Sequence, residues 1–252
     1  MNDIEFNAHV QNVIANNRSS EFLNDSKNWH DKSREYSYQY LFEWCGRPII
    51  QDPQDVLAIN KIIWDLNPDV IIETGVARGG SIMLSLCTMS TKKRFNQSNE
   101  EWLVIGVDLN LEGDTRKILE NSGFKSNLQL IAGSSIDEDV ISQVMHLVKP
   151  YKTKLFILDS NHTHDHVYQE LVKYSPLTQL GDRILVLDTG IEFLPPHQDT
   201  HSRWGKGSNP YTAIQKFLST EDNAFKFVID DDHYYRNGLT CFRGGHLKRV
   251  AV

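Results

Sequence analysis

Five short apolar runs dominate the pattern of this sequence, and stretches with helical spacing separate them. The runs cover residues 70–73, 102–108, 128–132, 154–159 and 183–188. The stretches between them, with the apolar spacing of helices, lie at about 79–90, 112–121, 136–148 and 162–174. Strands that alternate with helices are typical of a parallel sheet built from βαβ units. The sequence therefore predicts an α/β, Rossmann-like, doubly wound fold with a mostly parallel sheet.

The segments on either side complete the prediction. Asp52 and Pro53 have the pattern of an N-cap and a first helical residue, and this helix should end near Asn67-Pro68. Beyond the fifth run we expect a long connection over 189–211 and a helix over about 210–219. Two closing strands, near 225–229 and 239–249, bring the sheet to seven strands. We expect two parts: a helical N-terminal extension over 1–50 that ends in a Gly46-Arg47-Pro48 loop, and a Rossmann-like domain over 51–252.

Composition narrows the classes of partner. The formal net charge is −7 and there is no dense Lys/Arg block, which disfavours a nucleic-acid partner and favours a small molecule. No apolar run approaches the ~20 residues that cross a bilayer, and the polar N-terminus lacks a secretion signal. Three widely spaced cysteines, Cys45, Cys87 and Cys241, favour reduced thiols. We therefore expect a cytoplasmic protein without membrane insertion.

A glycine-rich turn follows the first run and leads into a helix. It reads ETGVARGGS and runs from Glu73 to Ser81. Glycines there let the backbone approach a ligand, and the helix N-terminus offers free N–H groups. The GxGxxG and GxxxxGK[ST] patterns are absent, and a carboxylate at Glu73 would repel a pyrophosphate but attract an ammonium. This favours an amino-acid cofactor, S-adenosylmethionine; the alternative is a purely structural turn.

The ends of the next two runs offer further cofactor contacts. Asp108 could accept hydrogen bonds from both ribose hydroxyls, or it could cap the next helix. Ser134 or Ser135 could contact the adenine edge, and we expect one of the two to be the N-cap of a helix that begins at Ile136.

The fourth and fifth runs end in the residues that indicate catalysis. Asp159 and Asp188 should converge, because the carboxyl ends of neighbouring parallel strands face the same crevice. Two facing carboxylates repel each other unless a hard cation such as Mg²⁺ or Mn²⁺ lies between them. His162 lies one short turn beyond Asp159 and has the chemistry of a general base. His164 and His166 fit surface or helix-packing positions better.

Several stretches, in this order, resemble the cephalosporin hydroxylase-like family of class I S-adenosylmethionine-dependent O-methyltransferases, which is related to macrolide sugar O-methyltransferases. They are GRPIIQDPQD (46–55), IIETGVARGGS (71–81), GVDL (106–109), LDSNHTHDHVYQEL (158–171) and WGKGSNPYTAIQKFL (204–218). The resemblance covers most of the chain from about residue 36.

The resemblance assigns roles residue by residue. It implies cofactor contacts at Glu73, Gly75, Arg78, Gly79, Ser81 and Asp108, a metal aspartate at Asp159 and a base at His162. Relatives commonly carry Glu-Asp where this chain has Leu187-Asp188, so one ligand is missing. Either Asp159 and Asp188 hold the cation with more water and Asn161, or metal dependence is weakened.

The combined expectation is an S-adenosylmethionine-dependent O-methyltransferase that is assisted by Mg²⁺ or Mn²⁺. Its expected acceptor is a hydroxyl of a sugar, either a nucleotide-activated sugar or a precursor of surface polysaccharide. The alternatives are a secondary-metabolite acceptor, a metal-dependent hydroxylase, and a non-catalytic cofactor-binding protein. Asn161 and Trp204 are candidate substrate contacts, Trp204 as part of a lid over 203–210 or of a packed connector. We expect Asp230–His233 to be a solvated turn and the chain to form a homo-oligomer, in which the aromatic extension covers the cleft or a subunit interface.

Overall fold

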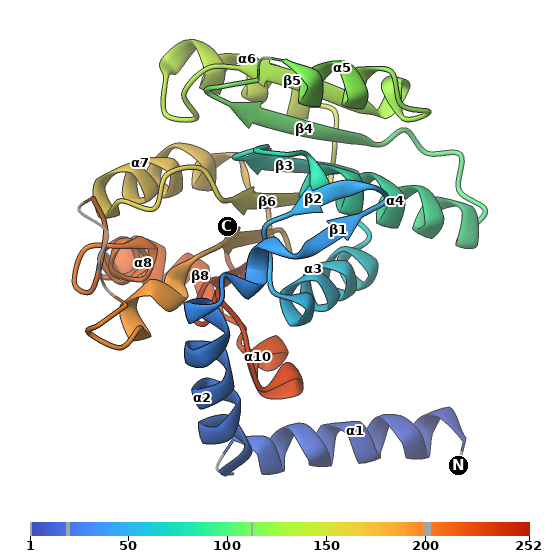
Figure 1. Ribbon diagram of the computed structural model, residues 1–252. Coiled ribbons are helices and arrows are strands. Elements are labelled where there is room, and N and C mark those ends of the chain that lie inside the picture. Colours follow the sequence, from blue (N-terminus) through green and yellow to red (C-terminus); the bar gives the residue numbers. More distant parts are fainter. Residues whose placement is uncertain (1, 19–20, 112, 199–202) are drawn as a thin grey trace.

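A seven-stranded sheet forms the centre of the molecule (Figure 1). The computed structural model describes residues 2–18, 21–111, 113–198 and 203–252. The strand order is β5-β4-β3-β6-β7-β9-β8. Their bounds are β3 (Val70–Thr74), β4 (Leu103–Asp108), β5 (Leu128–Ala132), β6 (Lys154–Leu158), β7 (Arg183–Val186), β8 (Phe227–Ile229) and β9 (His246–Arg249). The first five strands in this order pair in parallel, and β9 is antiparallel to both β7 and β8. The predicted doubly wound, mostly parallel seven-stranded sheet is confirmed.

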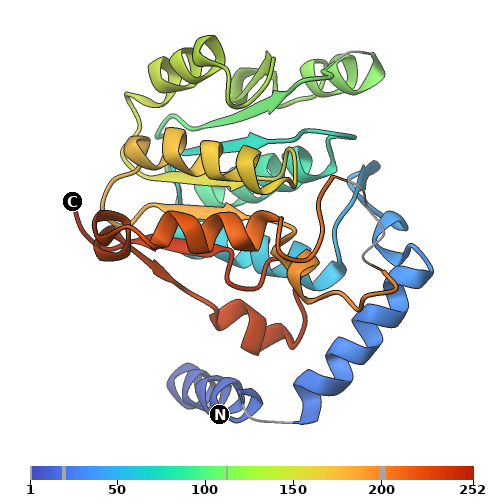
Figure 2. The ribbon, with the colours of Figure 1, turned by 90° about the vertical axis from the view of Figure 1, so that its left-hand side faces the viewer.

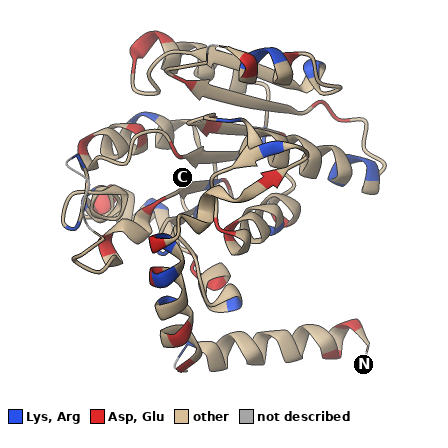
Figure 3. Cartoon of the chain, in the orientation of Figure 1, with Lys and Arg blue, Asp and Glu red and all other residues tan. Residues whose placement is uncertain are grey.

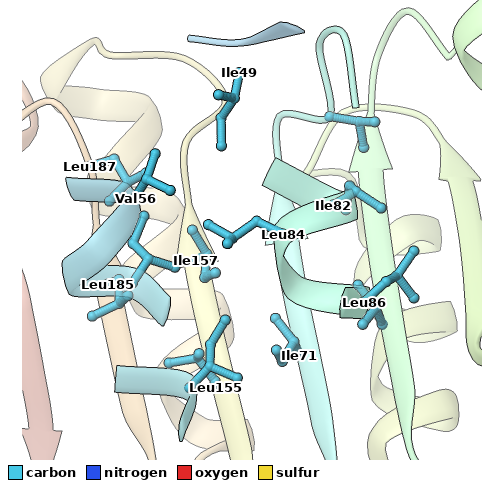
Figure 4. Close-up of a cluster of buried hydrophobic side chains, with 14 of the residues drawn as sticks. Ile49, Val56, Ile71, Ile82, Leu84, Leu86, Leu155, Ile157, Leu185 and Leu187 are labelled. Carbon is cyan, nitrogen blue, oxygen red and sulfur yellow. The ribbon is translucent and has the colours of Figure 1, made fainter. Parts of the chain in front are cut away.

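Helices cover both faces because the strands alternate their apolar side chains between two cores. On one face, α3 (Pro53–Leu66), α4 (Gly80–Phe95) and α5 (Asp114–Glu120) pack on side chains such as Ile71, Ile157 and Leu185 (Figure 4). On the other, α6 (Glu138–Val148), α7 (His164–Tyr174) and α8 (Pro210–Leu218) pack on Ile72 and Phe156, among others. Helices cover both faces of the central strands β3, β6 and β7, so the carboxyl-terminal edge of these strands is the part left to bind ligands.

The first fifty residues fold into two helices and a hairpin. Helices α1 (Asp3–Asn17) and α2 (Glu21–Glu35) extend from the body, and α1 lies beside α10 (Asp232–Asn237) (Figures 1 and 2). A short η1 (Tyr38–Tyr40) leads into the antiparallel strands β1 (Phe42–Trp44) and β2 (Arg47–Ile49), which pack on α4. The remaining short elements are η2 (Lys125–Asn127), η3 (Ser175–Leu177), η4 (Thr189–Phe193) and α9 (Glu221–Lys226).

Local chemistry accounts for several element ends. Asp52 stands at the N-cap position of α3, Pro53 occupies the first turn, and the helix ends at Asn67, as predicted. The Asp52 side chain makes no capping hydrogen bond, and Asn67 has the left-handed conformation. The last turn of α4 carries Lys92, Lys93 and Arg94, whose charges offset the negative end of the helix dipole (Figure 3). Within the described residues, none of the helices combines the length and apolar character that a membrane span requires.

Four local predictions are wrong. Arg47 and Pro48 belong to strand β2 and not to a loop, because they pair with Trp44 and Glu43 across the hairpin. The last strand begins at His246 and not near 239, since residues 239–245 turn back over η4 through bonds such as Gly190 N–H to the Cys241 carbonyl.

The acidic run and a helix start also differ from expectation. Asp232 begins α10, His233 is buried against the Phe242 ring, and Asp230 pairs with Arg183, so this segment is not a solvated turn. Helix α6 begins at Glu138 with Asp137 at the N-cap position. Neither Ser134 nor Ser135 caps it, because the chain makes one more turn after Gly133 before the helix starts.

Candidate active site

The glycine-rich turn lies against the end of the neighbouring strand β6. Gly75 has φ +89°, a conformation that favours glycine, and its N–H donates to the Val107 carbonyl at 2.8 Å. A Cβ at this position would lie 2.0 Å from the Asp159 carbonyl oxygen. Gly79, at φ +83°, precedes the first residue of α4. The turn therefore needs glycine to reach the backbone that carries Asp159.

Glu73 is buried beneath this turn. One oxygen accepts a hydrogen bond from the Ser81 hydroxyl, and the other, Oε2, has no hydrogen-bond partner among the described residues. Burial raises the pKa of Glu73 to about 7, and the Ser81 bond opposes that rise. An unpaired buried carboxylate oxygen under a ligand-binding turn fits a group that brings positive charge to the site.

Asp108 leaves β4 at the same edge of the sheet. Its carboxylate accepts from the Ala77 N–H at 2.9 Å and from the Asn110 N–H at 2.7 Å. It does not cap α5, whose N-cap residue is Gly113. Each carboxylate oxygen retains accepting capacity beyond these bonds, so Asp108 is fixed with its acceptors at the cavity described below.

Ser134 and Ser135 follow β5, farther from the centre of the site. The Ser135 hydroxyl lies 2.9 Å from His166 Nε2 and 3.3 Å from the Ser160 hydroxyl, which donates to Glu170 at 2.8 Å. His166 is thus a packing residue, as expected. Of this network, only Ser160 lines the cavity next to the glycine-rich turn.

Asp159, His162 and Asp188 come together at the ends of β6 and β7. One ligand atom from each lies within 4.8 Å of the other two, a spacing that can hold a metal ion. His162 Nδ1 is 3.4 Å from Asp188 Oδ2. Asp188 stands just past β7 with φ +54°, a conformation that Asp tolerates better than most side chains, and this turns its carboxylate toward β6. The sequence-based convergence of the three residues is confirmed.

The electrostatics of this cluster fit a cation. Burial raises the pKa of Asp159 well above its usual range, and the negative charges of Asp188 and Glu73 raise it further. A hydrogen bond from Gln51 Nε2 to Asp159 Oδ2, at 3.1 Å, opposes the rise. Asp159 and Asp188, two carboxylates that repel each other, offer the oxygen ligands that Mg²⁺ or Mn²⁺ prefers, and His162 lies beside them.

Two cavities meet at His162 and Asp188, and Asp159 lines the smaller of the two. The smaller, about 210 Å³, lies over the glycine-rich turn and includes Arg78, Ser81 and Asp108 in its wall. The larger, about 410 Å³, lies toward the N-terminal extension and includes Arg34 and Trp204. Both are lined by Ile50, Gln51, His162 and Asp188. The geometry therefore offers two adjoining compartments with the acid-histidine cluster at their junction.

A family model described as Rhamnosyl O-methyltransferase/CmcI matches residues 36–250. The chain belongs to this family. Rhamnosyl O-methyltransferase of Mycobacterium tuberculosis is 28% identical over 197 residues, which are 77% of this chain and 73% of that protein. The Mycobacterium leprae rhamnosyl O-methyltransferase is 26% identical over 175 residues, 69% of each.

Solved structures of CmcI share the fold. An apo structure of CmcI superposes with a TM-score of 0.58 at 21% identity, and the match covers 84% of this chain and 78% of CmcI. A CmcI structure with Mg and SAM gives a TM-score of 0.54 at 20% identity with the same coverage. The family inferred from the sequence motifs is thus confirmed.

Leu187 departs from the Glu-Asp pair expected in this family. Its side chain is 1% exposed and packs in the apolar cluster that includes Val56 (Figure 4). On this face of the sheet, the group that contacts Asp159 is the Gln51 amide. The Asn161 side chain accepts from the Thr163 N–H at 3.0 Å, and Asn161 lines neither cavity.

The segment from 203 to 210 has features of both predicted alternatives. Trp204 lies edge-on to His162, with ring centroids 5.0 Å apart, and lines the larger cavity. Asn209 is buried and ties the segment down through bonds to Glu192 at 2.6 Å and to the Gly205 carbonyl at 2.7 Å. The segment is therefore an anchored connector that presents one aromatic wall; residues 199–202 lie outside the described part.

Sequence reasoning expected the aromatic N-terminal extension, to which Tyr40 belongs, to cover the cleft or a subunit interface, and Tyr40 lines the larger cavity. It did not identify Arg34 on α2, Gln39 and Gln51, which line the same cavity. Burial lowers the pKa of Arg34, but negative charges, chiefly that of Asp188, outweigh burial and raise it. The aromatic richness before residue 45 was a signal of contact, but no spacing rule links a residue near position 34 to strand ends at 159 and 188.

Proposed function

We propose that this chain transfers the methyl group of S-adenosylmethionine to a hydroxyl of a sugar, with help from a divalent cation. The observation that carries the proposal is the pair of cavities that share His162 and Asp188, with Asp159 beside them in the wall of the smaller cavity. A methyl donor in one compartment and an acceptor in the other would place the reacting atoms beside a base and a cation site.

The relatives support the choice of donor and acceptor. Rhamnosyl O-methyltransferases of mycobacteria are named for a sugar residue, and CmcI has been solved with Mg and SAM. We propose a nucleotide-activated sugar or a surface-polysaccharide precursor as the acceptor. The secondary-metabolite acceptor, the hydroxylase and the non-catalytic protein have no observation here that favours them over this choice.

The residues of the smaller cavity would hold S-adenosylmethionine. We assign Gly75, Arg78 and Ser81, which line the cavity, to the turn that contacts it, together with Gly79, which does not line it, and we assign Asp108 to the ribose hydroxyls. Glu73 supplies negative charge beneath the turn, opposite the cofactor's ammonium. Ser134 and Ser135 retain the proposed contact with adenine, although neither lines the cavity.

The residues at the junction would handle the acceptor hydroxyl. When bound, S-adenosylmethionine supplies the methyl group, and a cation held by Asp159 and Asp188 lowers the pKa of the hydroxyl. His162 accepts the hydroxyl proton, and the nearby Asp188 carboxylate stabilises the imidazolium that results. The Trp204 ring offers a flat apolar wall for a sugar face. Asn161 keeps its proposed contact with the substrate, although it lines neither cavity and its side chain accepts from the Thr163 N–H.

Chelation tests the cation, and calorimetry tests the cofactor. We expect S-adenosylhomocysteine to bind the purified protein and 2-oxoglutarate not to bind. Methyl transfer from radiolabelled S-adenosylmethionine to a panel of nucleotide sugars should stop in EDTA and return with Mg²⁺ or Mn²⁺. Full activity in the chelator would remove the metal from the proposal, and binding of 2-oxoglutarate alone would favour a hydroxylase.

We further propose a homo-oligomer in the cytoplasm. Support comes from the apolar side chains that α1 exposes, since Ile4 is 81% and Phe6 56% exposed. Light scattering on the protein as it elutes from a size-exclusion column would measure its molar mass. The mass of a monomer at every micromolar concentration tested would contradict the proposed homo-oligomer. The division of the chain at residue 50 also remains our proposal.

A further inference from the structure

Cys45 and Cys87 lie next to each other although they are far apart in the sequence. Their Sγ atoms are 3.6 Å apart. Cys45 is exposed in the turn between β1 and β2, with φ +49°, and Cys87 is partly buried on α4. Both are free thiols. A disulfide requires an S–S separation of about 2.05 Å, so the two sulfurs need to approach by only about 1.5 Å.

The two thiols differ in their surroundings. Burial raises the pKa of Cys87 to about 11, and the adjacent Cys45 adds to the rise. Cys87 therefore stays protonated near neutral pH, while Cys45 is the sulfur that a dissolved reagent reaches first. An exposed thiol with a second thiol behind it is the arrangement of an attacking and a resolving cysteine.

We propose that Cys45 and Cys87 form a reversible disulfide by exchange with a low-molecular-weight disulfide, and that this bond fastens the β1–β2 hairpin to α4. The Cys45 thiolate attacks the small disulfide, whose S–S bond breaks and releases one thiol. Cys87 then loses its proton and attacks the Cys45 sulfur of the mixed disulfide, which releases the second thiol. Two protein thiols are oxidised, one small disulfide is reduced, and the two released thiols carry the two protons.

The fastened hairpin is one wall of the smaller cavity. It forms a two-stranded sheet of its own, separate from the central sheet. Pro48 and Ile49 line the cavity, and Arg47 donates to the Arg78 carbonyl at 3.0 and 2.7 Å. A covalent tie from the hairpin turn to α4 would restrain the opening of this wall. The cofactor should then enter and leave the cavity more slowly, and this last consequence rests on the proposed function.

Peptide mapping tests the bond itself. The whole protein is incubated with glutathione disulfide or with dithiothreitol, alkylated, digested and analysed by mass spectrometry. We expect a Cys45–Cys87 peptide in the oxidised sample, with Cys241 free as an internal control because it is buried. Cys45→Ser should form no link, and Cys87→Ala should retain one glutathione on Cys45. A wild-type protein that also retains glutathione on Cys45, or links through Cys241, would overturn the proposal.

Hydrogen exchange tests the fastening without any cofactor. In the oxidised wild type, amides of 42–49 and 75–80 should exchange more slowly, on the order of tenfold, and neither variant should respond to oxidant. Equal exchange in both redox forms would refute the fastening. Dissociation of S-adenosylhomocysteine should slow by a similar factor, and an unchanged rate would refute control of the cofactor. If exchange slows but S-adenosylhomocysteine binds neither form, the fastening stands and the proposed function fails.

Discussion

His162 lies between two groups that govern its chemistry. Its Nδ1 faces the Asp188 carboxylate at 3.4 Å, and the Trp204 ring lies against the imidazole. The carboxylate lies within reach of the ring nitrogen, and the indole packs against the ring and limits its orientations. These contacts suit a residue that takes up a proton at a fixed place, and they separate His162 from its neighbour His164, whose Nδ1 lies 2.8 Å from the Thr212 hydroxyl between α7 and α8.

Replacement of His162 tests this difference. In His162→Ala we expect kcat to fall by about 10²- to 10⁴-fold, the usual contribution of a general base, with little change in S-adenosylhomocysteine affinity. His164→Ala is the matched control on the same helix start: it should keep its turnover and lose about 1 kcal/mol of stability with its hydrogen bond. Equal turnover in the two variants would argue against the assignment of His162 as base.

Glu73 makes a pH-dependent contribution to stability. Its pKa is about 7 in the folded protein against an ordinary 4.5. Between these values the folded state holds a proton that the unfolded state has released, so the free energy of unfolding falls as pH rises from about 4.5 to about 7. Above about pH 7, the ionisation of Glu73 lowers the free energy of unfolding by about 3 kcal/mol relative to its value below pH 4.5.

Glu73→Gln should therefore be more stable than the wild type at pH 8, by up to about 3 kcal/mol, and not at pH 4.5. Urea unfolding at a series of pH values measures the difference. Glu43→Gln on the exposed side of β1 is the control and should show no such trend. A stability difference that is the same at both pH values would mean that Glu73 does not titrate as the buried site requires.

At the scale of elements, the site depends on how closely the hairpin approaches α4. Gly80 opens the helix, and a Cβ there would lie 2.4 Å from the Pro48 carbonyl oxygen and 2.7 Å from the Ile49 Cα. The same two hairpin residues line the smaller cavity. The absence of a side chain at one helical position thus sets the position of one cavity wall.

Gly80→Ala should push the hairpin away from α4. Such overpacking costs about 1–3 kcal/mol, and we expect a weaker affinity for S-adenosylhomocysteine because the wall moves with the hairpin. Gly123→Ala, where an added Cβ meets nothing within 4 Å, is the control and should bind normally. Thermal unfolding and calorimetry measure the two effects. Normal binding by Gly80→Ala would mean that the hairpin does not shape the cofactor site.

At the scale of the whole molecule, the N-terminal extension completes the larger cavity. Helix α2 brings Arg34 to that cavity, and the Arg34 Nε donates to His30 at 3.2 Å, next to Asp52 at the start of α3. The family match begins at residue 36, after this helix. The smaller cavity is therefore lined by residues of the part shared with the family, and Arg34 in the wall of the larger cavity lies outside that part.

Removal of residues 2–35 should affect binding in the larger cavity and leave binding in the smaller cavity nearly unchanged. We expect S-adenosylhomocysteine to bind with nearly unchanged affinity, and the KM for the acceptor to rise at least about tenfold, which corresponds to the loss of about 1.4 kcal/mol of binding. Arg34→Ala in the full chain should give a smaller rise in the same direction. An unchanged acceptor KM in both proteins would place the extension outside the acceptor site.

Local pattern determined the elements of this protein and the end of the sheet at which its chemistry lies. Buried strands need continuous apolar runs, helices need their own spacing, and parallel strands bring their carboxyl ends to one edge. For that reason Asp108, Asp159 and Asp188 were placed at the site from the sequence alone. The turn that needs Gly75 and the N-cap position of Asp52 followed from local backbone chemistry as well.

Only the tertiary structure decided which distant residues meet there. Gln51 on Asp159, Arg34 in the larger cavity and Cys45 against Cys87 are contacts between segments that no periodicity connects. Ser135 illustrates the opposite failure, because the local preference predicted a helix cap there, but the chain turns once more before α6 begins and the Ser135 hydroxyl contacts His166. Local rules act within a few residues, whereas these contacts depend on how the hairpin, α2 and the strand ends pack against one another.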